Sequence, residues 1–291
     1  YGTVFDFDGT RWRKVPVGTS WIRSLTAMPD GTVYVAATGD LGVLSPGRDG
    51  RLAFQSLKHA LPPDTPPLDV TWSSAALESA VWFVTSRAAL RWEKGRFSAF
   101  VFPTETPAQL RVVGGTLFLR RIGDGLYRWK ESGFHLISRE PEIARPRFVA
   151  LVEHDEPGVT LVATETGATY RLAGDVLTAT SSPLSEAIRA NGLRMLSRLR
   201  DGTLALASER GLLLFDSEGQ LLHHWTEAED RLSNDLIYWL HEDDSSGLWI
   251  ATQGGISRLE RHTGITLFDA ANGRGPAILF DSLSWRGKTY W

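Results

Sequence analysis

The sequence predicts an all-β protein, a β-propeller built from four-stranded antiparallel blades. Three observations lead to this prediction. A unit made of a small residue, an apolar run, a short turn and a second apolar run recurs along the chain. The recurrences begin about 43 residues apart on average, a period typical of propeller repeats. Helical periodicity is almost absent, except at residues 182–192, where Pro183 suits the first turn of a short helix.

Each recurring hairpin supplies the second and third strands of a blade, and apolar segments on either side supply the first and fourth. Four strands of about six residues with four short connections fill about 40 residues. The turns between first and second strands carry residues such as Asp30-Gly31 and Asp201-Gly202, which suit two-residue loops. We expect complete blades at approximately 20–57, 69–102, 108–138, 146–180, 193–227 and 236–270.

The two ends of the chain each carry half of the repeating unit. Residues 2–17 resemble third and fourth strands, and residues 276–291 resemble first and second strands. Together they predict about seven blades, six complete and one made of the two half-blades, in a single domain spanning 1–291. Such closure removes exposed sheet edges. Because the chain begins with Tyr1, we also expect it to be a fragment of a longer protein.

Two other β architectures remain as alternatives. A β-sandwich would also contain many short strands, but nothing in it requires the hairpin to recur six times. A parallel β-helix would need a much shorter period.

Composition narrows the functional classes. The chain has 291 residues, 42% hydrophobic and 22% charged, with a net charge of −3. This balance offers no basic surplus for nucleic acid, and no apolar run is long enough to insert directly into a membrane. The absence of cysteine excludes disulfides, thiolate metal sites and cysteine nucleophiles.

Residues 232–269 contain the most specific motif in the chain. An apolar strand ends in an acidic pair, a "GLWIAT" strand follows, and a "GGI" turn comes next. The segment resembles the two-component-regulator propeller repeat, whose pattern is matched here by Leu232, Asn234, Glu242-Asp243, residues 247–252 and residues 254–256. The resemblance extends loosely over the rest of the chain. It implies the extracytoplasmic sensor region of a bacterial membrane-anchored signalling protein, such as a histidine kinase, with its output domain outside this chain.

No motif predicts catalysis or metal binding. Seven histidines are scattered, none with the helical spacing of a zinc protease site. The segment "HEDDSSG" at 241–247 lacks the ligand alternation of a calcium loop and reads as a hairpin turn. No nucleophile elbow or phosphate loop is present. We therefore expect no catalytic residue, no metal and no cofactor.

A ligand is expected where the loops between second and third strands meet the starts of the first strands. Arg23 and Arg194 occupy matching places in their first strands, and a cation there suits carboxylate or sulfate groups. First-strand tryptophans and polar turn residues complete the candidate site. The candidate ligand-binding residues are Trp21, Arg23, Asp40, Trp72, Arg87, Arg121, Arg194, Glu209, Arg210, Trp239 and Gln253.

Three functions follow from these expectations. The first is a non-enzymatic sensor that binds a small molecule or oligosaccharide in the periplasm and signals through a homodimer formed outside this chain. The second is a propeller enzyme, such as a polysaccharide or lactone lyase, which requires a histidine and a carboxylate at the rim. The third is a protein-interaction scaffold, which requires an exposed apolar patch.

Overall fold

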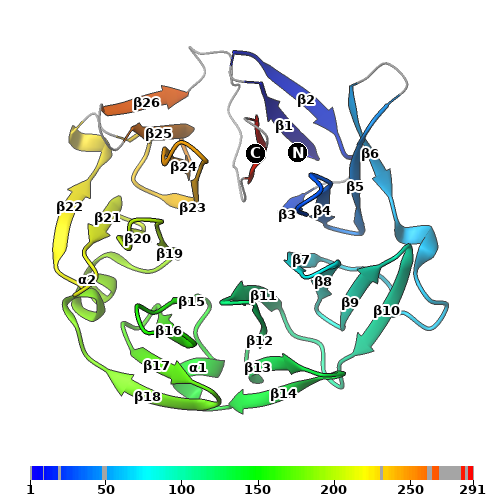
Figure 1. The fold of residues 1–291 in the computed structure, drawn as a ribbon, viewed down its shortest axis with the longest axis horizontal. Coiled ribbons are helices and arrows are strands. Elements are labelled where there is room, and N and C mark those ends of the chain that lie inside the picture. Colours follow the sequence, from blue (N-terminus) through cyan, green and yellow to red (C-terminus); the bar gives the residue numbers. More distant parts are fainter. Residues whose placement is uncertain are drawn as a thin grey trace. The chain divides into compact units, whose positions relative to one another are not determined.

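The computed structural model describes residues 2–8, 10–18, 21–47, 51–229 and 232–260, and the backbone of 264–268, 283–285 and 288–290. The chain divides into two compact units. The first comprises Tyr1–His135 and Leu283–Trp291, and the second comprises Leu136–Ser282. Each unit is described by itself below, with the elements labelled as in Figure 1.

The first unit contains three sheets that are continuous in sequence, each an antiparallel meander of four strands; the last strand of the third sheet ends in the first residues of the second unit. Their strands are β3 (Ile22–Ala27), β4 (Val33–Ala37), β5 (Asp40–Pro46) and β6 (Leu52–Ser56); β7 (Thr71–Leu77), β8 (Ala80–Thr85), β9 (Ala88–Glu93) and β10 (Arg96–Val101); β11 (Ala108–Val113), β12 (Thr116–Arg121), β13 (Gly125–Lys130) and β14 (Gly133–Ser138). A short 3-10 helix, η1 (Lys58–Ala60), follows β6.

A further sheet in this unit combines the two ends of the chain. Its strands are β1 (Thr3–Phe7), β2 (Trp12–Pro16), β27 (Leu283–Trp285) and β28 (Lys288–Tyr290), in the order β2-β1-β28-β27 (Figure 1). β1 pairs antiparallel with β28, and Asp6 lies opposite Tyr290. The two chain ends therefore pair with each other, as their half-unit patterns predict.

The second unit contains three more four-stranded meanders. Their strands are β15 (Val149–Glu153), β16 (Val159–Thr164), β17 (Thr169–Ala173) and β18 (Val176–Thr180); β19 (Met195–Arg198), β20 (Leu204–Ala207), β21 (Leu212–Phe215) and β22 (Leu221–Trp225); β23 (Ile237–Glu242), β24 (Leu248–Thr252), β25 (Ile256–Glu260) and β26 (Gly264–Phe268). The connections carry α1 (Pro141–Ala144), α2 (Pro183–Asn191) and η2 (Glu227–Glu229). The chain thus has an all-β propeller fold with six sequence-continuous blades of four antiparallel strands. None of the helices in the described ranges is long and apolar enough to span a bilayer.

The loops between β3 and β4 and between β19 and β20 have three residues, so the expected two-residue loops at Asp30-Gly31 and Asp201-Gly202 are wrong. The N–H of Gly31 bonds to the carbonyl of Met28, and the N–H of Met28 bonds to the carbonyl of Thr32. Gly31 has a φ of 87°, a left-handed conformation that closes such a loop after a type I turn. The Asp30 carboxylate also accepts a bond from the N–H of Thr32, which favours the longer loop.

Neighbouring first strands are joined by a recurring hydrogen bond. The first strand is an edge of its sheet, so its outward N–H groups have no partner within the ladder. The N–H of Ser74 in β7 bonds to the Ser24 hydroxyl of β3 at 3.2 Å, and the N–H of Leu110 in β11 bonds to the Ser73 hydroxyl at 2.7 Å. In the second unit the N–H of Leu240 bonds in the same way to the sulfur of Met195 at 3.3 Å.

Aromatic side chains pack between sheets of the first unit, as expected for the tryptophans of second and third strands. Trp82 of β8 is 1% exposed. Its ring lies 5.5 Å from Phe100 of its own sheet, and 4.6 Å and 5.7 Å from Trp129 and Phe134 of the next sheet. These edge and stacked contacts add to the stabilisation that comes from burial alone.

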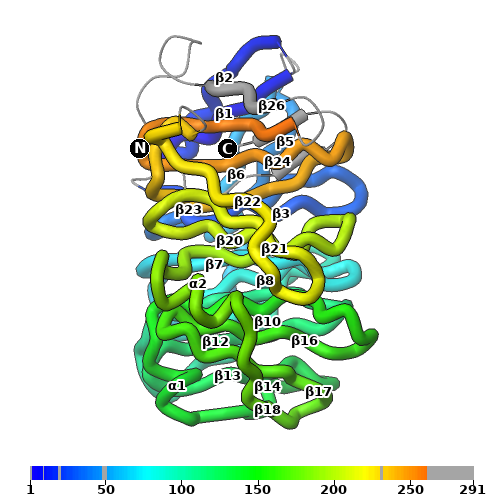
Figure 2. The backbone as a smooth tube through the Cα atoms, turned by 90° about the vertical axis from the view of Figure 1, so that its left-hand side faces the viewer, coloured from blue at the N-terminus to red at the C-terminus, as the bar shows by residue number. Residues whose placement is uncertain are grey.

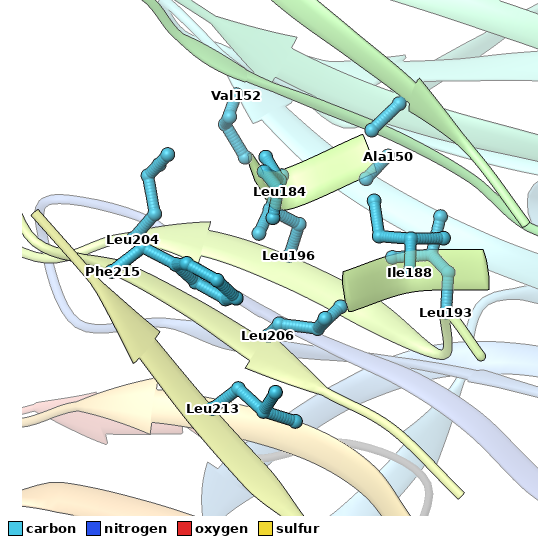
Figure 3. Close-up of a cluster of buried hydrophobic side chains, with 11 residues drawn as sticks. Ala150, Val152, Leu184, Ile188, Leu193, Leu196, Leu204, Leu206, Leu213 and Phe215 are labelled. Atoms are coloured by element: carbon cyan, nitrogen blue, oxygen red, sulfur yellow. The ribbon is translucent and has the colours of Figure 1, made fainter. Parts of the chain in front are cut away.

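In the second unit α2 fills the connection between β18 and β19. Pro183 stands in its first turn, as the sequence predicts, and Gly192 follows its last residue. Leu184 and Ile188 are buried in a cluster with residues from both neighbouring sheets, including Leu206 and Phe215 (Figure 3). Figure 2 shows α2 beside these sheets. The helix is therefore a fixed part of this unit and supports the turn at Glu209, whose N–H bonds to the carbonyl of Asn191.

Asp243 organises the hairpin between β23 and β24. One carboxylate oxygen accepts bonds from the N–H groups of Ser245 and Gly247 and from the Ser245 hydroxyl, at 2.6 to 2.9 Å. The other accepts from the Trp249 indole at 2.7 Å and from Arg258 at 2.8 and 3.0 Å. Burial alone would raise the pKa of Asp243, but these bonds lower it to about 2. The acidic pair of the "HEDDSSG" segment thus belongs to a structural turn.

Gly247 is required by the same arrangement. A Cβ at this position would lie 2.4 Å from the Arg258 guanidinium, which itself lies over the Trp249 ring at 5.3 Å. The spacing of Asp243, Gly247 and Trp249 therefore follows from one buried ion pair and its stacking partner.

We predict that Ser73→Ala destabilises the protein by about 1–3 kcal/mol, because the buried N–H of Leu110 loses its acceptor. Urea denaturation followed by tryptophan fluorescence measures this loss. Ser98→Ala is the matched control, since Ser98 is exposed on β10, and we expect it to change stability by less than about 0.5 kcal/mol. Equal effects of the two substitutions would contradict the role assigned to the inter-sheet bond.

We predict that Asp243→Asn costs about 2 kcal/mol at neutral pH, because the pKa falls from 3.8 to about 2 on folding. A carboxylate with a lowered pKa stabilises the fold above its unfolded pKa. The contribution disappears as the pH falls through the folded value, so variant and parent should converge near pH 2. Asp244→Asn is the control, because the Asp244 side chain is 78% exposed. A stability difference that persists unchanged at pH 2 would refute the assignment.

Candidate functional site

In several of the sequence-continuous sheets, the turn between second and third strands lies against the start of the first strand. The N–H of Thr38 bonds to the carbonyl of Trp21, that of Glu165 to Phe148, and that of Gln253 to Leu236. The turns and the first-strand starts therefore share one end of each sheet, which is where the sequence places the ligand site.

A hydroxyl at the end of the second strand fixes several of these turns. Thr85 accepts bonds from the N–H groups of Arg87 and Ala88, and Thr252 accepts from those of Gly254 and Gly255. Ser208 accepts from the N–H of Arg210 and donates to the carbonyl of Gly211. This recurring cap holds the turn backbones in place, so the outward side chains at these turns are presented from a rigid frame.

A β-bulge occurs near the start of several first strands. One extra residue interrupts the register between Ile22 and Ser24, between Thr71 and Ser73, and between Ile237 and Trp239. The extra residues are Arg23, Trp72 and Tyr238. Arg194 stands at the matching place, because its N–H bonds to the carbonyl of Ala207 while Met195 pairs with that residue. A bulge re-aims the side chain that it carries.

In the first unit the bulges bring Arg23 against two tryptophans. Its guanidinium carbon lies 5.8 Å from the centre of the Trp21 ring and 5.3 Å from that of Trp72, within cation–π distance. The Trp72 indole also donates to the Ser86 hydroxyl at 2.9 Å. Burial lowers the pKa of Arg23. Three predicted site residues, Trp21, Arg23 and Trp72, are thus brought together.

In the second unit the matching group is built around Arg194. Its guanidinium carbon lies 4.6 Å from the Phe148 ring centre and 5.2 Å from that of Tyr238. The nearest carboxylate oxygen belongs to Glu209, at 3.7 Å. Burial is the main cause that lowers the pKa of Arg194, opposed by the negative charge of Glu209. The structure therefore places Arg194 and Glu209, both predicted, in one group.

The remaining candidates of the first unit have defined partners. The Asp40 carboxylate accepts from the Ser56 hydroxyl and from the N–H of Leu41. Arg87 forms an exposed ion pair with Glu105. Arg121 is 2% exposed, pairs with Asp124, bonds to Thr104 and lies over the Phe102 ring at 4.4 Å. These side chains brace their own loops and are not among the rings and cations of the Arg23 group.

The remaining candidates of the second unit are turn residues and one tryptophan. Arg210 and Gln253 are exposed on their turns, and the carbonyl of Arg210 is bonded by His224. Trp239 is half-buried and pairs with Ala251. The ring beneath Arg194 is that of Tyr238, so the expectation for this first strand is displaced by one residue.

Phe148 and Tyr238 are site residues that the sequence analysis missed. The bulge shifts the first strand by one position, which a strict alternation of strand residues does not include. A sequence signal for Tyr238 does exist, because Tyr238 precedes Leu240 by two residues just as Arg23 precedes Leu25 and Arg194 precedes Leu196.

The histidines considered for catalysis lie in different surroundings. His59 is exposed on η1. The neighbouring Lys58 ammonium donates to the carbonyl of Gly39, which places η1 beside the turn between β4 and β5. His154 accepts a bond from the N–H of Glu156, at the hairpin between β15 and β16. Burial lowers the pKa of His241 to about 4, so that this ring is neutral at neutral pH. Across the described ranges, no cluster of three or more acidic or histidine side chains is arranged to hold a metal ion.

No protein-family model and no curated protein sequence matches the chain. Solved structures do match. A catalytically inactive virginiamycin B lyase from Staphylococcus aureus with quinupristin is 13% identical, with a TM-score of 0.68 over 92% of this chain and 93% of that one. The extracellular domain of the putative one component system BT4673 from B. thetaiotaomicron is 17% identical, with a TM-score of 0.66 over 87% of this chain and 35% of that one.

A third similar structure is the extracellular domain of the putative hybrid two component system BT3049 from B. thetaiotaomicron. It is 15% identical, with a TM-score of 0.62 over 91% of this chain and 36% of that one. This chain therefore spans about a third of the length of both B. thetaiotaomicron domains. At these identities the similarities establish the propeller fold alone, which sensors and lyases share.

Proposed function

We propose that this chain is the ligand-binding propeller of an extracytoplasmic sensor in a bacterial membrane-anchored signalling protein, and that it has no catalytic activity of its own. The observation that carries the proposal is the Arg194 group. A half-buried cation lies within cation–π distance of two aromatic rings, at the end of the sheets where turns and first strands meet. Such a group recognises a ligand without providing a nucleophile or a base.

The comparisons support this proposal through fold and context. Two of the similar structures are extracellular domains of putative one- and two-component systems. The blade at 232–269 carries the regulator-type motif, whose Asp243 turn the structure explains. In this proposal the sheet formed by the two chain ends serves as a seventh blade. The ligand is a small molecule or oligosaccharide in the periplasm, and the signalling dimer forms outside this chain.

A lyase is the second candidate. The virginiamycin B lyase similarity covers nearly all of both chains, and His59 is an exposed imidazole beside a rim turn. An elimination needs a base that removes a proton, and the reaction leaves a double bond in the product. The described residues give His59 no hydrogen-bonded carboxylate to orient it, whereas catalytic bases are usually oriented by a second group.

We predict that a compound from a panel of mono- and oligosaccharides raises the thermal midpoint of the purified chain and is recovered unchanged. Binding to the native state alone stabilises it by about 2.7 kcal/mol at a ligand concentration 100 times Kd. Scanning fluorimetry detects the shift, titration calorimetry gives Kd, and mass spectrometry identifies the recovered compound.

The control for this experiment is His59→Ala, which should bind the same compound with unchanged Kd. Appearance of a product with a new double bond, lost in His59→Ala, would instead establish the lyase. If no compound of the panel binds, the result counts against the proposed sensor function.

A further inference from the structure

The guanidinium of Arg194 is held in place while its hydrogen-bond donors stay available. No acceptor within hydrogen-bond distance of the guanidinium occurs among the residues that the structure describes. The carboxylate of Glu209 lies at 3.7 Å, beyond a hydrogen bond. The Arg194 side chain is 17% exposed, so part of it faces solvent.

Arg198, the last residue of the strand β19 that follows Arg194, shows what a structural arginine of similar burial looks like. Its side chain is 14% exposed. It donates to the carbonyl of Glu153 and the carboxylate of Asp155, both at 2.6 Å, and to the carbonyl of Gly202 at 2.9 Å. Two arginines with nearly equal exposure thus differ in hydrogen bonding. Burial alone does not account for the free donors of Arg194.

The stacking partners of Arg194 explain how it is ordered without hydrogen bonds. Phe148 precedes β15 and Tyr238 lies in the bulge of β23, so three consecutive sheets contribute to the group. Rings approach a guanidinium over its face, whereas its N–H groups point outward along its edge. The two cation–π contacts therefore restrain the guanidinium without using an N–H donor in a hydrogen bond. An edge with two parallel donors fits a carboxylate or sulfate group.

We propose that Arg194 binds a carboxylate or sulfate group of a ring-shaped ligand, and that Phe148 and Tyr238 hold the guanidinium in the binding orientation. The inference rests on the proposed ligand-binding function and names its chemical class: an acidic sugar or a sulfated sugar. Preorganisation of the side chain reduces the conformational entropy lost on binding.

Glu209 limits the affinity of this group for anions. Its carboxylate is 61% exposed and lies near Arg194 without a hydrogen bond, on a turn fixed by Ser208 and α2. An incoming anion must approach Arg194 against this charge. Arg194 attracts the anion, and Glu209 offsets part of that attraction; a neutral sugar receives neither effect, so the preference for an anion comes from Arg194.

Titration calorimetry with D-glucuronate, D-glucose 6-sulfate, D-glucose and inorganic sulfate tests the proposal. We expect D-glucuronate or D-glucose 6-sulfate to bind, D-glucose to bind at least tenfold more weakly, and inorganic sulfate alone to bind more weakly than its sugar ester. Arg194→Gln should raise the Kd of the acidic ligand by about 10- to 100-fold, which corresponds to the loss of a charge-assisted hydrogen bond. The two acidic probes distinguish a carboxylate from a sulfate ligand.

Arg171→Gln is the matched control, because it removes the same charge from β17, where Arg171 pairs with Glu156. Its affinity for the acidic ligand should stay within about twofold of the parent. Glu209→Gln should lower the Kd of that ligand by about two- to fivefold. A poorly folded variant cannot produce such a gain in affinity. Arg194→Lys keeps the charge but loses the paired donors, so we expect an intermediate Kd.

The proposal is overturned if no acidic probe binds the parent, or if Arg194→Gln and Arg171→Gln bind the acidic ligand equally well. It is also overturned if Glu209→Gln weakens the acidic ligand. If neutral saccharides bind all variants with equal affinity, the proposed anion site is refuted, whereas the proposed ligand-binding function is retained.

Discussion

The hydrogen-bonding requirement of the first strands is the constraint on which the rest of the site depends. A first strand is the edge of its sheet, and its outward N–H groups must find acceptors outside the ladder. Side chains of the preceding sheet supply them, from Ser24 to Ser74, from Ser73 to Leu110 and from Met195 to Leu240. These bonds fix how neighbouring first strands lie along each other. The residue just before each acceptor is then brought against its counterpart on the next strand, which is how Arg23 meets Trp72 and Arg194 meets Tyr238.

The two ends of the sheets in the second unit use charge differently. At the end that carries the turns between first and second strands, the Asp243 carboxylate accepts hydrogen bonds from five groups. At the same end, Arg198 and Arg200 donate to carbonyls and carboxylates of adjacent turns. Charges paired in this way join neighbouring sheets. At the other end, Arg194 is ordered by ring faces. Desolvation without hydrogen bonds is unfavourable for a cation, and an incoming anion relieves that cost.

The sequence predicts most of the fold and about half of the site. The repeat places the strands because each hairpin alternates apolar residues around a glycine turn, and the paired half-units predict the contact of β1 with β28. Loop length was wrong at Asp30-Gly31, since the aspartate side chain stabilises a longer turn. Tyr238 was not among the predicted residues, because a bulge adds a residue without changing the apolar pattern. Phe148 lies outside its strand, so strand periodicity gives no information about it.

The fold alone does not distinguish a sensor from a lyase, because both kinds of protein share it. The distinction depends on which groups change protonation. An elimination requires a base, for which the exposed His59 is the candidate. Burial lowers the pKa of His241 to about 4, at the end of β23 next to the β23–β24 turn. The candidate group of the second unit is built around Arg194. An arginine keeps its proton under all physiological conditions. A permanent cation with oriented donors recognises charge and shape. It transfers no proton, and that property suits a protein that must bind its ligand and release it unchanged.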